Sequence, residues 1–195
     1  MASTMTSRGL IAVYVEHVAR HLVLISMISL TRVISQEQTA QSSTLCDDAR
    51  QTIACPLPCY CRAPDHRAVR CDDGGLTSVP ASVWSVAPVS LNFSFNAIAE
   101  WTGVGVSTTD NDHHVACLAT LILSHSGVGR IRPRSFERLR GLRRLMLDHN
   151  DIATLDEASF VGLRQLQLLD VSHNELVALP HSLFYDLAQL KVSRP

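Results

Sequence analysis

Three histidines spaced 24 residues apart form the most regular set of chemically versatile side chains in the sequence; they are His125, His149 and His173. Imidazole nitrogens bind transition metals and titrate near neutral pH, so a row of them could form a metal-binding strip or a pH-sensitive edge. The equal spacing also has a simpler interpretation, because a duplicated sequence unit carries its surface residues with it. We favour repeated surface residues over a metal site or a catalytic base.

A second group of candidate metal ligands lies in the polar segment GVGVSTTDNDHHVA, which contains Asp110, Asp112, His113 and His114. Adjacent aspartates and histidines could bind a metal, but on a polar loop such side chains are usually solvated. The sequence shows no nucleophile with an organised base and no site that would hold both. We therefore expect a protein that is not an enzyme and that needs no metal or other cofactor.

Cysteines supply a third possible chemistry. Cys55, Cys59 and Cys61 occur in the motif CPLPCYC, and Cys71 follows in VRCDDGGLTSVP. Clustered cysteines bind zinc or form disulfides, and we favour disulfides because no histidine stands at ligand spacing. Four cysteines allow three pairings, among which the residues alone do not choose.

Two further cysteines, Cys46 and Cys117, leave several arrangements open. They could pair with each other, remain free, or bridge to another chain. Neither has a nearby organised base, so neither is predicted to be a catalytic thiol.

All these groups lie on or beside a repeated unit of 24 residues between positions 118 and 189. The unit reads L-x-x-L-x-L-x-x-N-x-I and ends with a phenylalanine about ten residues later. The L-x-L core alternates with period two, so Leu121 and Leu123 should point inward from a short strand while Ile122 points outward. One such strand cannot bury its apolar side alone, which predicts neighbouring units stacked into a parallel sheet.

This pattern resembles the leucine-rich repeat, and the cysteine motif resembles the N-terminal cap of extracellular proteins of that family. The cap motif is C-P-x-x-C-x-C, then a cysteine just before the residues Gly75, Leu76, Thr77, Val79 and Pro80. The resemblance implies an α/β-type solenoid: a short horseshoe with parallel strands on its concave face, loops or short helical turns on its convex face, and a disulfide-bonded cap. It also implies the pairings Cys55–Cys61 and Cys59–Cys71.

The family pattern further implies a ladder of asparagine side chains after the strands, represented here by Asn150 and Asn174. Ser126 occupies the same position in the first regular unit. A hydroxyl makes only part of the contacts of an amide, so we expect a weaker rung there and not a break.

The chain divides into six parts on these criteria. Residues 22–30 are an uncharged apolar run that is too short to span a bilayer, which favours a secretory signal and a secreted, extracellular location. The expected parts are a signal peptide (1–35), a flexible linker (36–54), the cysteine-rich cap (55–87), an irregular first repeat with an insertion (88–117), three regular repeats (118–189) and an incomplete repeat stub (190–195). Because the chain lacks a C-terminal cysteine cap, we expect a fragment of a larger protein or an end covered by another chain.

The outward strand positions carry the best candidate for a ligand-binding surface. Three of them are apolar on successive strands, and charged residues stand beside them, as in protein interfaces. The predicted ligand-binding residues are Ile122, Arg144, Met146, Asp148, Leu168 and Asp170. The sequon Asn92-Phe93-Ser94 predicts a glycan at Asn92, on the same face.

An arginine-rich run is a second candidate surface, which would suit a glycosaminoglycan or another acidic partner. It contains Arg130, Arg132, Arg134, Arg138, Arg140, Arg143 and Arg144. The alternative is a solvated face balanced by acidic neighbours such as Asp148, Asp151, Asp156 and Glu157. The formal net charge of the chain is −1, and we expect no nucleic-acid partner.

The sequence therefore predicts a secreted or ectodomain module that binds an extracellular protein in adhesion, reception or guidance through the concave sheet. Two alternatives remain. One is the N-terminal fragment of a multidomain extracellular enzyme such as a matrix peroxidase, which begins with this type of module. The other is a structural matrix component that binds collagen or glycosaminoglycan.

Overall fold

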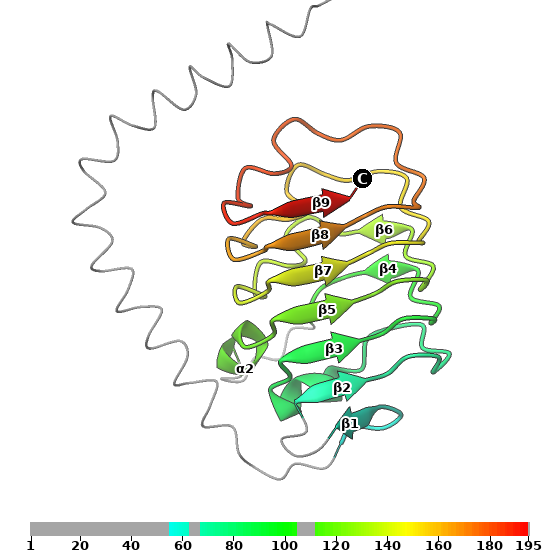
Figure 1. Cartoon of the computed structure of the whole chain (residues 1–195). Coiled ribbons are helices and arrows are strands. Elements are labelled where there is room, and N and C mark those ends of the chain that lie inside the picture. The colour runs from blue at the N-terminus through cyan, green and yellow to red at the C-terminus, as the bar shows by residue number, and fades with distance from the viewer. Residues whose placement is uncertain (1–54, 63–66, 105–111, 195) are drawn as a thin grey trace, which may run out of the picture. The chain divides into compact units, whose positions relative to one another are not determined.

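The computed structural model of the chain describes residues 55–62, 67–104 and 112–194 (Figure 1). The predicted signal peptide, the predicted linker and Cys46 lie outside these residues. Most of the described chain winds through successive turns that each contribute one strand to a common sheet.

The sheet has seven strands in the order β1-β2-β3-β5-β7-β8-β9. All neighbours are parallel except β1 and β2, which are antiparallel. The strands are β1 (Tyr60–Arg62), β2 (Ala68–Arg70), β3 (Ser90–Asn92), β5 (Thr120–Ile122), β7 (Arg144–Met146), β8 (Leu168–Asp170) and β9 (Val192–Arg194). Consecutive strands lie side by side in chain order, as expected of a solenoid.

The central residue of each strand points into the core, as the alternation predicted. Leu121 is the register partner of Leu145, which is in turn the partner of Leu169, and all three are fully buried. Leu91 and Val69 continue this row through β3 and β2. The 24-residue period therefore becomes a row of aliphatic side chains across the sheet.

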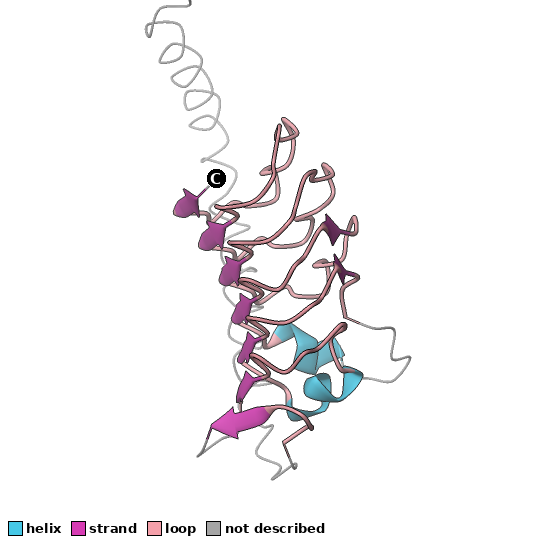
Figure 2. Cartoon of the chain, turned by 90° about the vertical axis from the view of Figure 1, so that its right-hand side faces the viewer, coloured by secondary structure: helices cyan, strands magenta, loops and turns pink. Residues whose placement is uncertain are grey.

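The opposite side of the solenoid consists mainly of loops and turns (Figure 2). It also carries a second sheet, in which β4 (Glu100–Trp101) pairs in parallel with β6 (Arg130–Ile131). Two short helices occur near the cap, the 3-10 helix η1 (Ala81–Val86) and α2 (Asp112–Ala116), which pack against each other. The predicted convex side of loops and short helical turns is confirmed.

Aromatic rings fill the space between the two sides. Trp101 stacks on Phe136 with 5.2 Å between ring centroids, and Phe160 lies 6.1 Å beyond Phe136. All three side chains are at most 1% exposed. The repeated phenylalanine of each unit thus continues an aromatic core begun by the tryptophan of the irregular repeat.

Two disulfides hold the cap, Cys55–Cys61 and Cys59–Cys71. These are the pairings that the family resemblance implied. Cys117 is also disulfide-bonded. Its predicted alternative as a free thiol is therefore wrong, while Cys46, the partner considered for it, lies outside the described residues.

The asparagine ladder is present, and Ser126 is its weaker rung. Asn150 Nδ2 donates to the carbonyl oxygens of Leu123 and Leu147, both at 2.8 Å. Ser126 keeps the bond to the preceding repeat, because its hydroxyl donates to the Phe93 carbonyl oxygen at 2.7 Å. The serine has no amide with which to make the remaining contacts of the ladder.

Residues 190–195, predicted to be an incomplete stub, form more structure than the pattern required. Strand β9 pairs in parallel with β8, and Ser193 is the register partner of Leu169. Parallel pairing uses backbone groups, so the strand forms although serine replaces the expected leucine. Among the described residues, no helix has the length and apolar character needed to cross a membrane.

Candidate binding surface

The outward face of the sheet consists of the side chains of β3, β5, β7 and β8 that point away from the core. Their register places them in two rows. The first row is Ser90, Thr120, Arg144 and Leu168, and the second is Asn92, Ile122, Met146 and Asp170. Neighbours in a row stand about 4.8 Å apart along the hydrogen-bonding direction, close enough to act as one surface.

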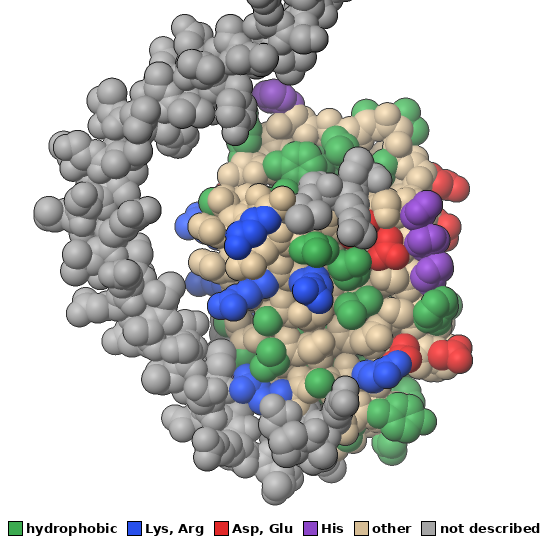
Figure 3. Space-filling view, viewed as in Figure 1, with side chains coloured by type: hydrophobic (Ala, Val, Ile, Leu, Met, Phe, Trp, Pro, Cys, Tyr) green, Lys and Arg blue, Asp and Glu red, His purple; other side chains and the backbone are tan. Residues whose placement is uncertain are grey.

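The three apolar residues predicted for this face do lie together. Ile122 and Met146 are register partners in the second row, and Leu168 is next to Arg144 in the first. Each of the three is partly exposed. The space-filling view shows hydrophobic side chains gathered over the middle of the sheet (Figure 3).

Arg144 and Asp148 supply charge beside this apolar centre. Arg144 is exposed, whereas Asp148 is partly buried at the end of β7. Asp148 Oδ1 accepts a hydrogen bond from the Ser124 hydroxyl at 2.6 Å, and its Oδ2 lies 3.2 Å from His149 Nδ1. Burial raises the pKa of Asp148, but the hydrogen bonds from Ser124 and His149 outweigh it and hold the pKa below its ordinary value.

Asp170 does not occupy the exposed position that the sequence predicted. Only 3% of its surface is accessible, although it stands at an outward strand position. Its Oδ1 accepts hydrogen bonds from the backbone N–H and the hydroxyl of Ser172. The carboxylate therefore serves the turn after β8, and we exclude it from the residues that meet a ligand directly.

Charge is distributed unevenly along the strand direction. Lys and Arg side chains gather toward the edge where the strands begin, while acidic side chains and histidines gather where they end (Figure 3). Exposed residues just before the strands include Arg140, Arg143 and Arg164, and those just after them include Asp151 and Glu175. A partner that lies across the strands would meet a basic edge, an apolar centre and an acidic edge in turn.

Asn92, the predicted glycosylation site, lies in β3 and is partly exposed. Its Oδ1 accepts hydrogen bonds from the Ser94 N–H at 2.9 Å and from the Ser94 hydroxyl at 2.7 Å. The two polar residues of the sequon are thus in contact on the outward face, in the same row as Ile122.

The arginine-rich run is divided between two parts of the surface. Arg132 Nε lies 2.9 Å from Glu100 Oε1, Arg130 lies 3.8 Å from the same oxygen, and Arg134 pairs with Glu137 at 3.3 Å. The predicted balance by Asp148, Asp151, Asp156 and Glu157 is corrected for these three arginines, because their carboxylate partners are Glu100 and Glu137. The hydrogen bond from Arg132 holds the pKa of Glu100 below its ordinary value.

The three regularly spaced histidines are exposed, as predicted, and they form a continuous stack. The His125 and His149 ring centroids are 4.2 Å apart, and those of His149 and His173 are 4.1 Å apart. The period predicted this row. It did not predict the contact between His149 and Asp148, because a period aligns equivalent positions and says nothing about side-chain conformation.

Comparisons with known proteins agree with this architecture. Residues 117–176 match the leucine rich repeat family, and residues 54–83 match the leucine rich repeat N-terminal domain. Among solved structures, TLR13 in its complex with ssRNA13 is 24% identical with a TM-score of 0.58, and human 5T4 (Wnt-activated inhibitory factor 1, trophoblast glycoprotein) is 24% identical with a TM-score of 0.55. No curated protein matches the chain.

The two structural matches extend beyond the region that they share with this chain. The TLR13 match covers 69% of this chain and 18% of TLR13, and the 5T4 match covers 72% of this chain and 62% of 5T4. At this identity the likeness establishes the fold, a leucine-rich repeat solenoid.

Proposed function

We propose that this leucine-rich repeat protein with a cysteine-rich N-terminal cap is a secreted or ectodomain module that recognises an extracellular protein through the outward face of its sheet. One observation carries the proposal: Ile122, Met146 and Leu168 lie partly exposed on three neighbouring strands, with Arg144 beside them. An apolar centre with charge around it is the usual composition of a protein interface.

The scaffold supports such a role because it holds the strands rigidly. Buried leucines lie directly beneath the outward residues, and the asparagine ladder joins successive turns. A preorganised surface loses little conformational entropy on binding, so more of the contact energy appears as affinity.

The disulfide-bonded cap supports the extracellular part of the proposal, since disulfides persist in oxidising compartments. A protein ligand is preferred to nucleic acid, although TLR13 was solved with ssRNA. The chain has a formal net charge of −1 and presents mixed charge on the face in question, whereas nucleic-acid binding depends on neutralising phosphates.

A glycan at Asn92 would limit where the ligand can lie. Asn92 is the register partner of Ile122, so a sugar on β3 would cover the cap side of the outward face. The ligand would then be confined to β5, β7 and β8, where the apolar residues are.

The test is a comparison of single charge insertions. The full chain, fused to an Fc dimer, is screened against a panel of purified cell-surface and matrix ectodomains, and the variants Met146→Glu and Leu168→Glu are compared on each positive partner. Val177→Glu is the matched control, because Val177 is apolar and 92% exposed but lies beyond the strands. We expect both outward-face variants to lose binding while the control and the thermal melts remain unchanged. Equal loss in all three variants would contradict the assignment of the face.

A sulfated polysaccharide is a second candidate ligand, and the structure moves its predicted site. Arg130, Arg132 and Arg134 are already paired with glutamates. Arg140 and Arg164 occupy equivalent positions one repeat apart and line one groove, which also contains Glu137 and Asp186, and Arg143 is exposed nearby in sequence.

Heparin chromatography distinguishes the two arginine groups. If the edge before the strands binds the polysaccharide, the double variant Arg143→Ala and Arg164→Ala should elute at lower salt than the wild type. The double variant Arg130→Ala and Arg132→Ala removes the same charge from the other side of the solenoid and should change elution less. The reverse order would exclude the edge.

A further inference from the structure

Four aromatic rings stack in a row where the strands of the sheet end. Phe95, His125, His149 and His173 follow one another with centroid separations of 4.8, 4.2 and 4.1 Å. The planes of neighbouring rings differ by 8°, 23° and 27°. All four side chains are exposed, and the histidines line one edge of the molecule (Figure 3).

The backbone fixes the spacing of this row. Each of the four residues has a positive φ, between 53° and 58°, so their side chains leave the chain in the same direction. The His125 N–H donates to the Asp148 carbonyl oxygen at 3.1 Å, and the His149 N–H donates to that of Ser172 at 3.0 Å. Successive imidazoles are therefore held at one repeat's distance even where their rings are free to turn.

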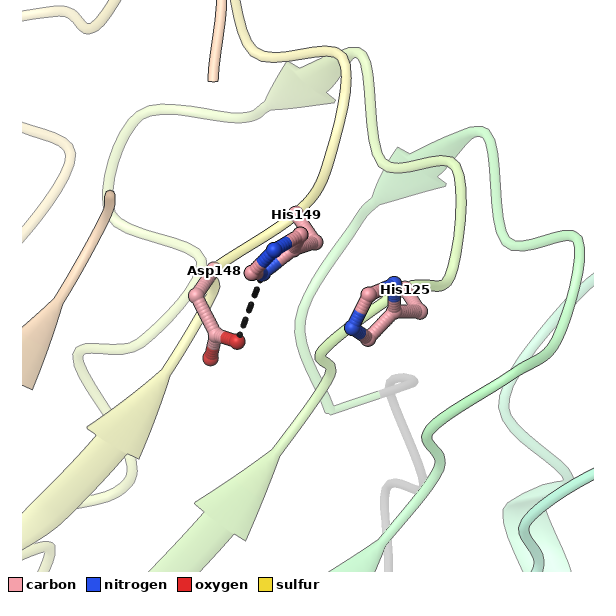
Figure 4. Close-up of side chains that lie close together, drawn as sticks. All are labelled: His125, Asp148 and His149. Atoms are coloured by element: carbon pink, nitrogen blue, oxygen red, sulfur yellow. Dashed lines mark hydrogen bonds and ion pairs between the residues drawn. The ribbon is translucent and has the colours of Figure 1, made fainter. Parts of the chain in front are cut away.

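One carboxylate interrupts the otherwise uniform surroundings of the row. The positions just before the three histidines are Ser124, Asp148 and Ser172. Asp148 is held in place by the Ser124 hydroxyl at 2.6 Å, and it reaches His149 Nδ1 at 3.2 Å. One ligand atom each from His125, Asp148 and His149 lie within 4.8 Å of one another (Figure 4).

We propose that His125, Asp148 and His149 form a surface site for a divalent transition-metal ion of the zinc class. Two imidazole nitrogens and one carboxylate oxygen are a ligand set that Zn²⁺ accepts, and a three-residue site leaves a fourth position for water or for a group of a partner. This proposal is independent of the protein-binding function, although both use Asp148.

The required movement is small and falls on side chains that can make it. Tetrahedral ligands at about 2.1 Å from zinc lie about 3.4 Å from one another, so the three donor atoms must close by at most about 1.4 Å. His125 and His149 are exposed and can turn about their Cβ–Cγ bonds, whereas Asp148 is partly buried and already fixed. Binding therefore converts parallel stacked rings into rings whose nitrogens converge on one point.

Calorimetric titration of the purified full chain with ZnCl₂ tests the proposal, with Co²⁺ visible absorption as a second readout of coordination. His125→Gln, His149→Gln and Asp148→Asn each remove one ligand. His181→Gln is the matched control, because His181 is exposed but stacks with Tyr185 outside the row. Thermal melts in the presence of a chelator confirm that the variants fold like the wild type.

We expect each ligand variant to weaken Zn²⁺ binding at least about tenfold, the lower end of what changes in metal coordination shells typically cost, and the control to leave it unchanged. The Co²⁺ absorption of the four-coordinate ion should be lost in the same three variants. A wild type that binds neither ion overturns the proposal. So does zinc affinity that is the same in His125→Gln, His149→Gln and His181→Gln, because the ion would then lie elsewhere on the chain.

Discussion

Replacing Asn150 by alanine should destabilise the solenoid far more than replacing its counterpart Ser126. Asn150 is 5% exposed and lies between the turns that follow β5 and β7. Its Nδ2 donates to three carbonyl oxygens, and its Oδ1 accepts from the N–H groups of Ser126 and Val128, both at 3.0 Å. The truncation removes five hydrogen bonds at one position.

The magnitude follows from which groups keep another partner. The Leu147 carbonyl oxygen also accepts from Asn174, and that of Asp148 from the His125 N–H. In the part of the chain that the structure describes, Ser126 N–H, Val128 N–H and the Leu123 carbonyl oxygen are left without a bond. At about 1 kcal/mol for each orphaned buried group, the low end of the range because water can enter the vacated space, the loss is about 3 kcal/mol.

For Ser126→Ala the same reasoning gives a smaller loss. The Phe93 carbonyl oxygen that accepts from the Ser126 hydroxyl also accepts from Asn96 at 2.7 Å, so no acceptor is orphaned. One neutral hydrogen bond contributes about 1 kcal/mol. Thermal and urea unfolding, followed by circular dichroism, should place the Asn150 variant about 6–12 °C below the wild type and the Ser126 variant about 2–4 °C below it. Equal shifts would refute the view that orphaned groups determine the cost.

Two further predictions concern the close contact between repeats and the convex ion pairs. A Cβ at Gly141 would overlap the carbonyl oxygen of Ala116, whereas one at Gly129 would meet only ordinary contacts, the nearest at 3.7 Å; Gly141→Ala should therefore cost about 1–3 kcal/mol in urea unfolding and Gly129→Ala less than about 0.5 kcal/mol, and equal costs would contradict the overpacking argument. The pKa of Glu100 is held below its ordinary 4.5 by the hydrogen bond from Arg132, so its stabilising effect should be complete above that value and disappear as pH falls through the lower folded value. Stability curves of the wild type and Glu100→Gln should accordingly differ slightly at pH 7 and converge in acid, and a gap that persists in acid would argue against this coupling.

The regular part of the fold was predictable because the period and the alternation together fix a register. Leu121, Leu145 and Leu169 recur every 24 residues, and they are register partners in the sheet. The exposed histidine row follows from the same arithmetic. The disulfide pairing came from the resemblance of the cap motif to a family, since four cysteines do not choose among three pairings themselves.

The parts that could not be predicted depend on contacts that a period does not encode. Arg132 pairs with Glu100, 32 residues away, because β6 lies beside β4 in a second sheet that starts in the irregular repeat. Asp170 stands at an outward position and is nevertheless buried, since the burial of a side chain depends on its neighbours and its rotamer. Strand β9 formed despite Ser193 because backbone pairing is indifferent to the missing leucine.

Where this protein departs from its own repeat is where it acquires chemistry. A position that repeats in every unit becomes a row, and a uniform row of leucine or asparagine builds the scaffold alone. Asp148 stands between Ser124 and Ser172, and this single substitution in a serine row brings a fixed carboxylate to the histidines and to the edge of the apolar patch. If both proposals hold, a metal ion at His125 and His149 would draw on Asp148, which the protein ligand would also meet. Zinc should then change the affinity of the wild type for its partner and leave that of His125→Gln unchanged, a coupling that neither proposal predicts by itself.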